Sequence, residues 1–244
     1  VTLSANREAS FKKQEQTSSS GSTTEERPDP GSFSLTPVSL TDAEKIAELD
    51  NVKSYSFESS ASAMAKDGIT AITSSDSSED SSETTDAGGE PAGGMGGNPQ
   101  TTQADFQISG VSATAQNSNF ADGTSKITDG GGIDDSDKGT NNVVIDSTLA
   151  ETNDLAVGDT FTITSTEDED TTYEMTIKGI YESSETSGSM GMKFNFMNPS
   201  NTLYTSYTFA NELNGTSDDN TIDSAIYTLS DPDKMDEFLK EAEK

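Results

Sequence analysis

One long stretch of the chain cannot contribute to a hydrophobic core. Residues 73–103 contain six acidic residues and no cation, and they lack Val, Ile, Leu, Phe and Tyr altogether. Such a segment cannot bury enough apolar surface to offset the entropy that it loses on ordering. We therefore predict a mobile acidic loop inserted between two strands. A calcium-binding role for its acids is the second interpretation, although their spacing does not fit an EF-hand loop.

The rest of the chain is also poor in core-forming residues. Val, Ile, Leu and Phe together number 39 among 244 residues, and the net charge is −30. This combination is close to the composition of chains that do not fold. One large uniform core is therefore not expected, and the apolar side chains must be concentrated in parts of the chain.

The residue types that are absent exclude several classes of function. The chain has no Cys and no His, which removes disulfides, thiolate zinc sites, the Ser–His–Asp triad and most transition-metal sites. The excess of negative charge argues against a nucleic-acid partner, because phosphate binding needs clustered cations. No apolar run reaches the roughly 18 residues of a membrane span. We predict that the chain is not an enzyme and holds no cofactor or metal.

The N-terminal third contains one polar region and one ordered region. We predict a helical stalk and linker over residues 1–31, with a disordered terminus as the alternative. Thr41 and Glu44 have the spacing of a capping box, which predicts a helix over about 42–49. An extended run follows over about 52–65, which we interpret as a strand.

The middle of the chain has the pattern of a strand meander. Short apolar runs predict strands at 106–111, 143–145, 161–163 and 173–181. Thr148 and Glu151 form a second capping box, which predicts a short helix after the second of these strands. The acidic residues 167–170 predict a solvated hairpin tip, and a cation site is the alternative there.

The segment 188–200 is rich in Met and Phe. Four apolar side chains alternate in it with small or polar residues: Met190, Met192, Phe194 and Phe196. A period of two predicts a half-buried core strand. Met and Phe also make adaptable contacts, so the four side chains could instead form a surface that binds a partner. They are our candidate partner-binding residues, and both interpretations stay open. A short helix is expected over 203–213.

The C-terminal part ends in an amphipathic helix. The run 222–229 predicts a strand, and Asp231 followed by Pro232 is typical of a helix start. Apolar residues with helical spacing then predict a helix over 232–243. We therefore predict an α+β fold with two lobes. A discontinuous β/α lobe is expected from residues 32–112, which include the acidic loop, and 221–244. A mainly β central lobe is expected from 113–220.

Four segments together resemble a known family. They are LTDAEKIAELDNVKSYSF (40–57), DFQISGV (105–111), NNVVIDSTLAETNDLAVGDTFTI (141–163) and YEMTIKGIYES (173–183). Their order is similar to that of the extracytoplasmic domain of MacB/FtsX-like ABC transporter permeases of the Gram-positive type. The Val-Gly-Asp box at 157–159 and the Lys-Gly-Ile-Tyr box at 178–181 carry most of this resemblance. The acidic loop departs from the family pattern in its length and charge.

The resemblance implies a role as well as a fold. It places the chain outside the cell membrane, between the first two membrane helices of a permease. The implied partners are an ATP-binding subunit reached through the membrane part, a membrane-fusion-like adaptor and a second permease copy in a dimer. The implied function is to couple cytoplasmic ATP hydrolysis to export of peptides or antimicrobials. None of the family motifs is catalytic. The alternatives are FtsX-like transmission of movement to cell-wall hydrolases, and a secreted adhesin or binding module.

Overall fold

The computed structural model describes residues 2–4, 37–73, 104–166, 168, 170–184 and 195–242. Most of the predicted stalk and linker, and all of the predicted acidic loop except Thr73, lie outside these residues. No helix in the described ranges has both the length and the apolar character needed to cross a membrane.

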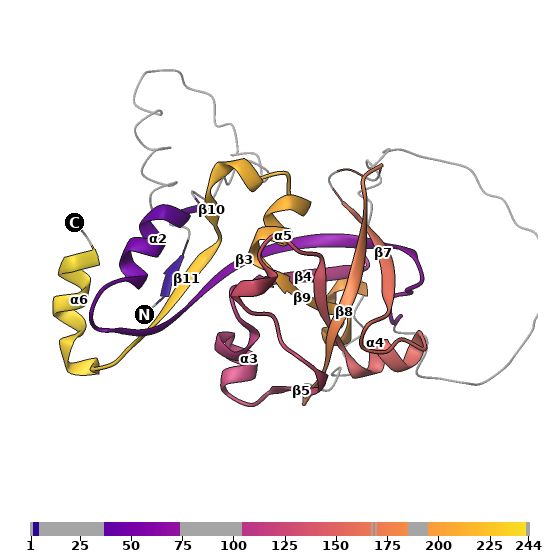
Figure 1. The fold of residues 1–244 in the computed structure, drawn as a ribbon, viewed down its shortest axis with the longest axis horizontal. Coiled ribbons are helices and arrows are strands. Elements are labelled where there is room, and N and C mark those ends of the chain that lie inside the picture. Colours follow the sequence, from indigo (N-terminus) through magenta and orange to yellow (C-terminus); the bar gives the residue numbers. More distant parts are fainter. Residues whose placement is uncertain are drawn as a thin grey trace, which may run out of the picture.

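The described residues form an elongated arrangement of strands with helices at its two ends and sides (Figure 1). The strands are β1 (Thr2–Ser4), β2 (Val38–Ser39), β3 (Val52–Asp67), β4 (Phe106–Val111), β5 (Ser125–Gly130), β6 (Asn142–Asp146), β7 (Thr160–Ser165), β8 (Thr172–Ser183), β9 (Thr202–Ser206), β10 (Thr221–Ile222) and β11 (Ser224–Leu229). The α-helices are α2 (Leu40–Ala47), α3 (Ser118–Ala121), α4 (Ser147–Thr152), α5 (Tyr207–Leu213) and α6 (Met235–Ala242). Short 3₁₀ helices are η1 (Thr114–Gln116), η2 (Asp135–Asp137), η3 (Asn195–Met197), η4 (Pro199–Asn201), η5 (Ser217–Asp219) and η6 (Pro232–Lys234).

Nine of these strands form one mixed sheet that closes on itself. The strand order is β1-β11-β3-β4-β9-β6-β8-β5, and β7 pairs with both β3 and β8. The strands β3, β4, β9, β6, β8 and β7 therefore form a closed ring. The strands β1, β11 and β5 extend the sheet beyond the ring, and β2 pairs with β10 separately.

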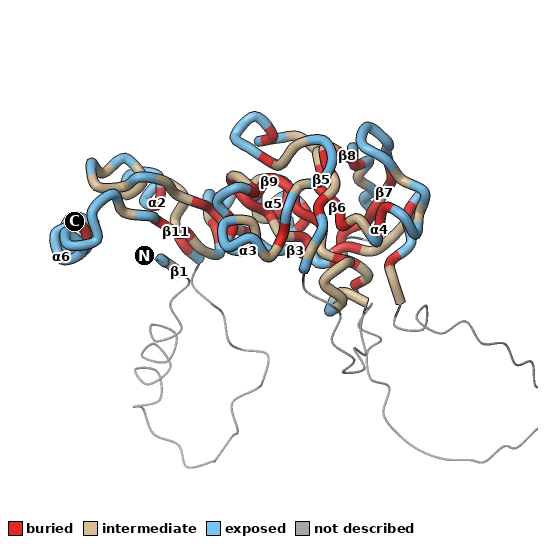
Figure 2. The backbone as a smooth tube through the Cα atoms, turned by 90° about the horizontal axis from the view of Figure 1, so that it is seen from below, coloured by how far each residue is buried: buried red, intermediate tan, exposed pale blue. Residues whose placement is uncertain are grey.

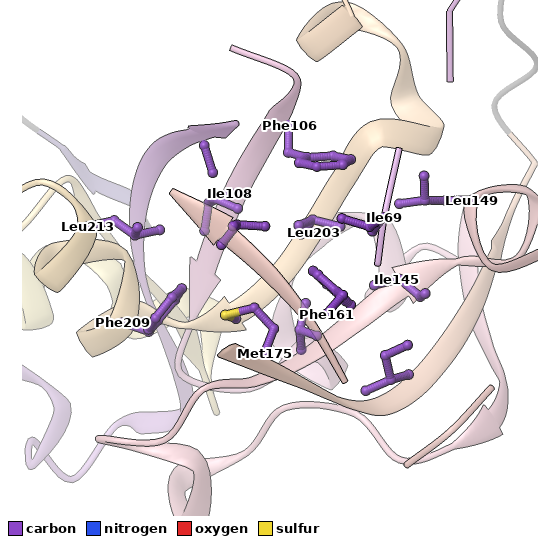
Figure 3. Packing of buried hydrophobic residues seen from close by; sticks show 14 of the residues in the cluster. Ile69, Phe106, Ile108, Ile145, Leu149, Phe161, Met175, Leu203, Phe209 and Leu213 are labelled. Atoms are coloured by element: carbon purple, nitrogen blue, oxygen red, sulfur yellow. The ribbon is translucent and has the colours of Figure 1, made fainter. Parts of the chain in front are cut away.

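The largest hydrophobic cluster fills the inside of this ring (Figure 3). Alternate residues of the ring strands point inward, such as Phe106 and Ile108 of β4. Phe209 and Leu213 of α5 cover one side of the cluster, and Leu149 of α4 lies at the other (Figure 3). Full burial of an aliphatic or aromatic side chain of this size stabilises a fold by roughly 1.5–3 kcal/mol. A short ring with few such residues can therefore hold together despite the chain's low apolar content.

A glycine permits the close approach of α5 to the ring. A Cβ atom on Gly110 of β4 would lie 2.6 Å from the Cβ of Ala210 and 2.8 Å from the Cα of Tyr207, both in α5. Contacts this short are not tolerated, so any side chain at this position would push the helix away from the sheet.

A second hydrophobic cluster, which we call the end cluster, joins the two ends of the described chain. It contains Val38, Ala43, Phe57, Tyr207, Ile222, Ala225, Tyr227 and Phe238. The rings of Tyr227 in β11 and Phe238 in α6 have centroids 6.1 Å apart, so α6 packs on the same strand as α2. Figure 2 shows that buried residues concentrate in the ring, whereas α6 is mostly exposed.

One strand belongs to both clusters. The 16 residues of β3 place Phe57 in the end cluster and Ala61 and Ala63 in the ring (Figure 1). The packing therefore changes from one cluster to the other within β3. Phe106 and Ile108 of β4 also pack in the ring. The division into lobes at residues 112 and 220 stays a prediction.

The α+β class is confirmed. The strands predicted at 52–65, 106–111, 143–145, 161–163 and 173–181 correspond to β3, β4, β6, β7 and β8, and the C-terminal helix corresponds to η6 and α6. The strand predicted over 222–229 is divided between β10 and β11, and several helix starts differ from those predicted. The N-cap of α2 is Ser39, whose hydroxyl accepts a hydrogen bond from the Asp42 amide, and not Thr41. The N-cap of α4 is Asp146, and not Thr148. The helix predicted over 203–213 begins only at Tyr207, because the preceding residues form β9 inside the ring.

Candidate functional site

A pocket of about 270 Å³ lies on the outer face of the ring. Gln107 and Ser109 of β4 line it together with Thr202 and Tyr204 of β9. The parallel register pairs Gln107 with Thr202 and Ser109 with Tyr204. Because side chains alternate along a strand, the residues next to these face the ring interior and these four face the pocket. The ring thus fixes the base of the pocket.

Two non-strand segments form the pocket walls. Asn117 and Asn119, at the start of α3, line one part. The residues from Phe196 to Pro199, in η3 and η4, line another. Asn117 also donates a hydrogen bond of 3.1 Å to Glu58 Oε1 of β3, which holds α3 against the sheet.

Three aromatic rings make the base rigid. The centroids of Phe120, Tyr181 and Tyr204 lie 5.0–5.7 Å apart in edge-to-face contacts, each worth about 0.5–1.5 kcal/mol beyond area burial. The Tyr181 hydroxyl donates to the Thr202 carbonyl oxygen at 3.1 Å. The Asn119 amide donates to the Tyr204 hydroxyl at 3.1 Å. Both tyrosines are almost fully buried, so the base does not need to rearrange when the pocket is occupied.

Asn201 fixes the wall formed by η3 and η4. Its fully buried side chain donates to the carbonyl oxygens of Ile72 and Asn195, at 2.9 and 2.8 Å, and accepts from the Ile72 amide at 2.9 Å. Asn195 in turn donates to Asp105 Oδ1 at 3.0 Å. The wall is therefore tied to the segments on both sides of the predicted acidic loop. On this fixed wall, Met197 is 51% exposed.

A family model described as the MacB-like periplasmic core domain matches residues 2–244. The chain belongs to this family. The resemblance inferred from the four sequence segments is thereby confirmed.

One sequence relative and two solved structures are similar to this MacB-like domain. The uncharacterized ABC transporter permease YclI of Bacillus subtilis (strain 168) is 46% identical over 244 residues, which are 100% of this chain and 48% of that protein. The chain thus spans about half the length of this relative. The periplasmic region of MacB from Actinobacillus actinomycetemcomitans has a similar fold, with a TM-score of 0.50 and 14% identity over 88% of this chain and 75% of that one. The extracellular domain of the noncanonic ABC-type transporter YknZ from Gram-positive bacteria gives a TM-score of 0.46 and 14% identity, over 84% of this chain and 80% of that one.

The structure describes one of the four candidate partner-binding residues. Met190, Met192 and Phe194 lie outside the described residues. Phe196 lies in η3 and lines the pocket. The strand predicted for this segment is wrong for residues 195–197, because Asn195 and Asn201 hold them in a helical turn.

Sequence reasoning missed most of the pocket of the MacB-like domain. Gln107 and Ser109 come from a segment that the prediction treated only as a core strand, and Asn119 came from no predicted element. Their common site depends on the pairing of β4 with β9. The only local signal was the Asn-rich run after Phe194.

An ionic cluster holds the loop that contains η2 against β8. Lys178 of β8 donates to Asp134 Oδ2 at 3.0 Å and to Asp137 Oδ2 at 2.6 Å. Asp137 is buried and also accepts from Asn142 at 2.8 Å. Hydrogen bonds from Ser136 and then from Lys178 lower the pKa of Asp134 to about 2. This cluster is structural, and no group of three or more metal-ligating side chains that could hold a metal occurs in the described part of the chain.

Proposed function

We propose that this MacB-like domain is the extracellular part of an ABC transporter permease of the cell membrane. The observation that carries the proposal is the 46% identity, across the whole chain, to a protein named as an ABC transporter permease. A permease of this class works with an ATP-binding partner, which is a separate cytoplasmic subunit or domain. The chain itself is not an enzyme.

The finer role is to couple ATP hydrolysis to export of peptides or antimicrobials, with a membrane-fusion-like adaptor and a second permease copy. The arrangement of the elements supports a mechanical role. β1 and α6 lie at the same end of the molecule (Figure 1), where β1 pairs with β11 and α6 packs on it. β11 pairs in turn with β3. Movement applied to either of these end elements therefore passes through β3 to the ring.

The adaptor surface is proposed on the pocket wall. Met197 is 51% exposed there, beside Phe196, and the remaining candidates Met190, Met192 and Phe194 precede it in the chain. The unbranched, polarizable side chain of Met adapts its shape to a partner, and Phe adds a large apolar surface. The wall is fixed by Asn201, so it presents Phe196 and Met197 in one arrangement.

Cysteine crosslinking in the intact permease tests this assignment. The 244 residues contain no Cys, so Met197→Cys introduces the only thiol of this domain once any Cys elsewhere in the permease has been replaced by Ser. Val157→Cys, at a residue 38% exposed, is the matched control. We expect adaptor crosslinks from position 197 and not from 157. Crosslinks from 157 alone would indicate that the adaptor contacts the domain near Val157 and not at the pocket wall. Crosslinks from neither position, together with export that does not need the adaptor, would overturn the adaptor proposal.

The permease proposal has its own test. Membrane vesicles that contain the permease and its ATP-binding partner are loaded with a labelled peptide, and export is followed with and without ATP. Phe196→Ser is expected to reduce export while the melting temperature stays unchanged. Unfolding of this variant would instead show that Phe196 is a core residue.

A further inference from the structure

The pocket differs chemically from the rest of this acidic chain. The chain carries 44 acidic and 14 basic residues, yet among the described residues that line the pocket none is charged. Four of them carry amide side chains: Gln107, Asn117, Asn119 and Asn198. A pocket of this composition gains no ion pair from a charged ligand. The described lining therefore favours a ligand that is neutral and polar.

Several of these polar side chains have hydrogen-bond donors or acceptors that no described group of the protein uses. Within the described ranges, the side chains of Gln107 and Ser109 make no hydrogen bond to the protein. Asn119 uses its amide nitrogen on Tyr204, which leaves its carbonyl oxygen available as an acceptor. An amide offers donors and acceptors side by side, and a hydroxyl does both at one atom. The pocket thus presents mixed donors and acceptors within a small area.

The pocket also has one apolar side. Phe196 and the exposed Met197 lie on the wall formed by η3. A ligand that fits must therefore combine a hydrogen-bonding edge with an apolar face. A sugar ring has this combination, because its hydroxyl groups project around the rim and its C–H bonds cover the two faces.

We propose that this pocket binds one ring of a neutral saccharide. The volume of about 270 Å³ lies just below the roughly 300–1,000 Å³ of pockets that enclose drug-sized ligands, which suits a single ring of a longer chain. In the bound state, Gln107, Ser109 and Asn119 hydrogen-bond the hydroxyls, and Met197 contacts a ring face. This inference goes beyond the proposed transport role and does not depend on it, and it implies that a saccharide and the proposed adaptor would compete for Met197.

An extended peptide fits the same place less well. Peptides commonly bind by adding a strand to a free sheet edge. β4, at the base of the pocket, pairs with β3 on one side and with β9 on the other, so it offers no such edge. A peptide lying across β4 would have to bind through its side chains alone.

The test is an NMR titration of the 244-residue chain with maltotriose and with N,N′,N″-triacetylchitotriose, whose rings carry neutral N-acetyl groups. Blocked trialanine is the peptide control. We expect the side-chain amide signals of Gln107, Asn117 and Asn119 to shift with at least one saccharide and not with the peptide. Gln107→Ala should weaken binding about fivefold, as expected for one lost hydrogen bond. Thr228→Ala, at an exposed position of β11, should leave it unchanged.

Three outcomes would overturn the proposal. The first is the absence of shifts with both saccharides at millimolar concentration. The second is a stronger response to the peptide at the same amide signals. The third is equal weakening by Gln107→Ala and Thr228→Ala. Gln107 is exposed, so its substitution should not affect folding, and equal melting temperatures of the variants verify this. The chain alone is titrated, so the result is independent of ATP-driven export and of the adaptor.

Discussion

The hydroxyl group of Tyr227 donates a hydrogen bond of 2.8 Å to the carbonyl oxygen of Ala43, which lies 184 positions earlier in the chain. Tyr227 lies in β11 and Ala43 in α2, and both are almost fully buried. Water therefore cannot take the place of either partner. This bond connects α2 to β11 inside the end cluster.

Removing that hydroxyl should destabilise the fold modestly. Tyr227→Phe keeps the ring that packs on Phe238 but loses the hydrogen bond, which costs about 1 kcal/mol. In a domain of this size, such a loss lowers the melting temperature by about 2–4 °C. Thermal unfolding measures this, with Tyr173→Phe as the control because that hydroxyl makes no hydrogen bond within the described ranges. Equal shifts in both variants would contradict the role of the Tyr227 bond.

Adding a methyl group to Gly110 of β4 should destabilise the fold more than removing the Tyr227 hydroxyl. Gly110→Ala places a Cβ within 3 Å of Ala210, Tyr207 and the Ser59 carbonyl oxygen, so α5 must move off the ring. We expect a loss of about 1–3 kcal/mol in the free energy of unfolding by urea. Gly131→Ala is the matched control, because its nearest new contact is 3.7 Å away, at the end of the Lys178 side chain. A loss as large at Gly131 as at Gly110 would show that close packing is not the cause.

The ionic cluster predicts a dependence of stability on acid. The pKa of Asp134 is lowered from 3.8 to about 2 by hydrogen bonds from Ser136 and Lys178. A carboxylate whose pKa is lowered in the folded state stabilises the fold above its unfolded pKa and loses this effect as the pH falls through the folded value. Between about pH 4 and pH 2, the native chain should therefore lose more stability than Asp134→Asn. The Asp134 side chain is 57% exposed, so solvent screening keeps the difference small.

Urea unfolding at the two ends of this pH window provides the measurement. The same comparison in a Lys178→Met background gives the coupling between the two residues. We expect the effect of Asp134→Asn to be smaller in that background. An identical effect in both backgrounds would assign the lowered pKa to Ser136 alone.

The predicted acidic loop should be dispensable for folding. Its sequence has no Val, Ile, Leu, Phe or Tyr side chain to bury, so replacing residues 76–100 by a short Gly-Ser linker should shift the melting temperature by only a few degrees. A loss on the order of 2 kcal/mol or more would instead indicate that the segment packs or holds an ion. Repeating the melt with added calcium separates these two explanations.

The ring strands other than β9 were predictable because their inward residues repeat with a local period of two. Phe106 and Ile108, for example, alternate with Gln107 and Ser109. The helix starts were less predictable, although capping boxes were present. Ser39 still pairs with Thr221 at the end of β2, so α2 begins as soon as that pairing stops.

Long-range contacts explain the remaining differences. The hydroxyl of Thr41, predicted as a helix cap, instead accepts a hydrogen bond from Asn220. The pocket depends on such contacts throughout, because Gln107 meets Thr202 only through the pairing of β4 with β9. No local pattern encodes that neighbour, so the candidate site inferred from the sequence captured Phe196 and missed the amides around it.

The end cluster imposes an order on biosynthesis. Its members include Val38 and Ala43 as well as Tyr227 and Phe238, so it cannot be completed until residue 238 has been made. β3 likewise waits for β11, whose residues are synthesised some 170 positions later. Contacts so distant along a chain form slowly, and unpaired strands that wait for their partners are prone to aggregate. Until β11 has been made, the nascent chain has exposed strand edges. Its large negative charge repels neighbouring copies and keeps them apart.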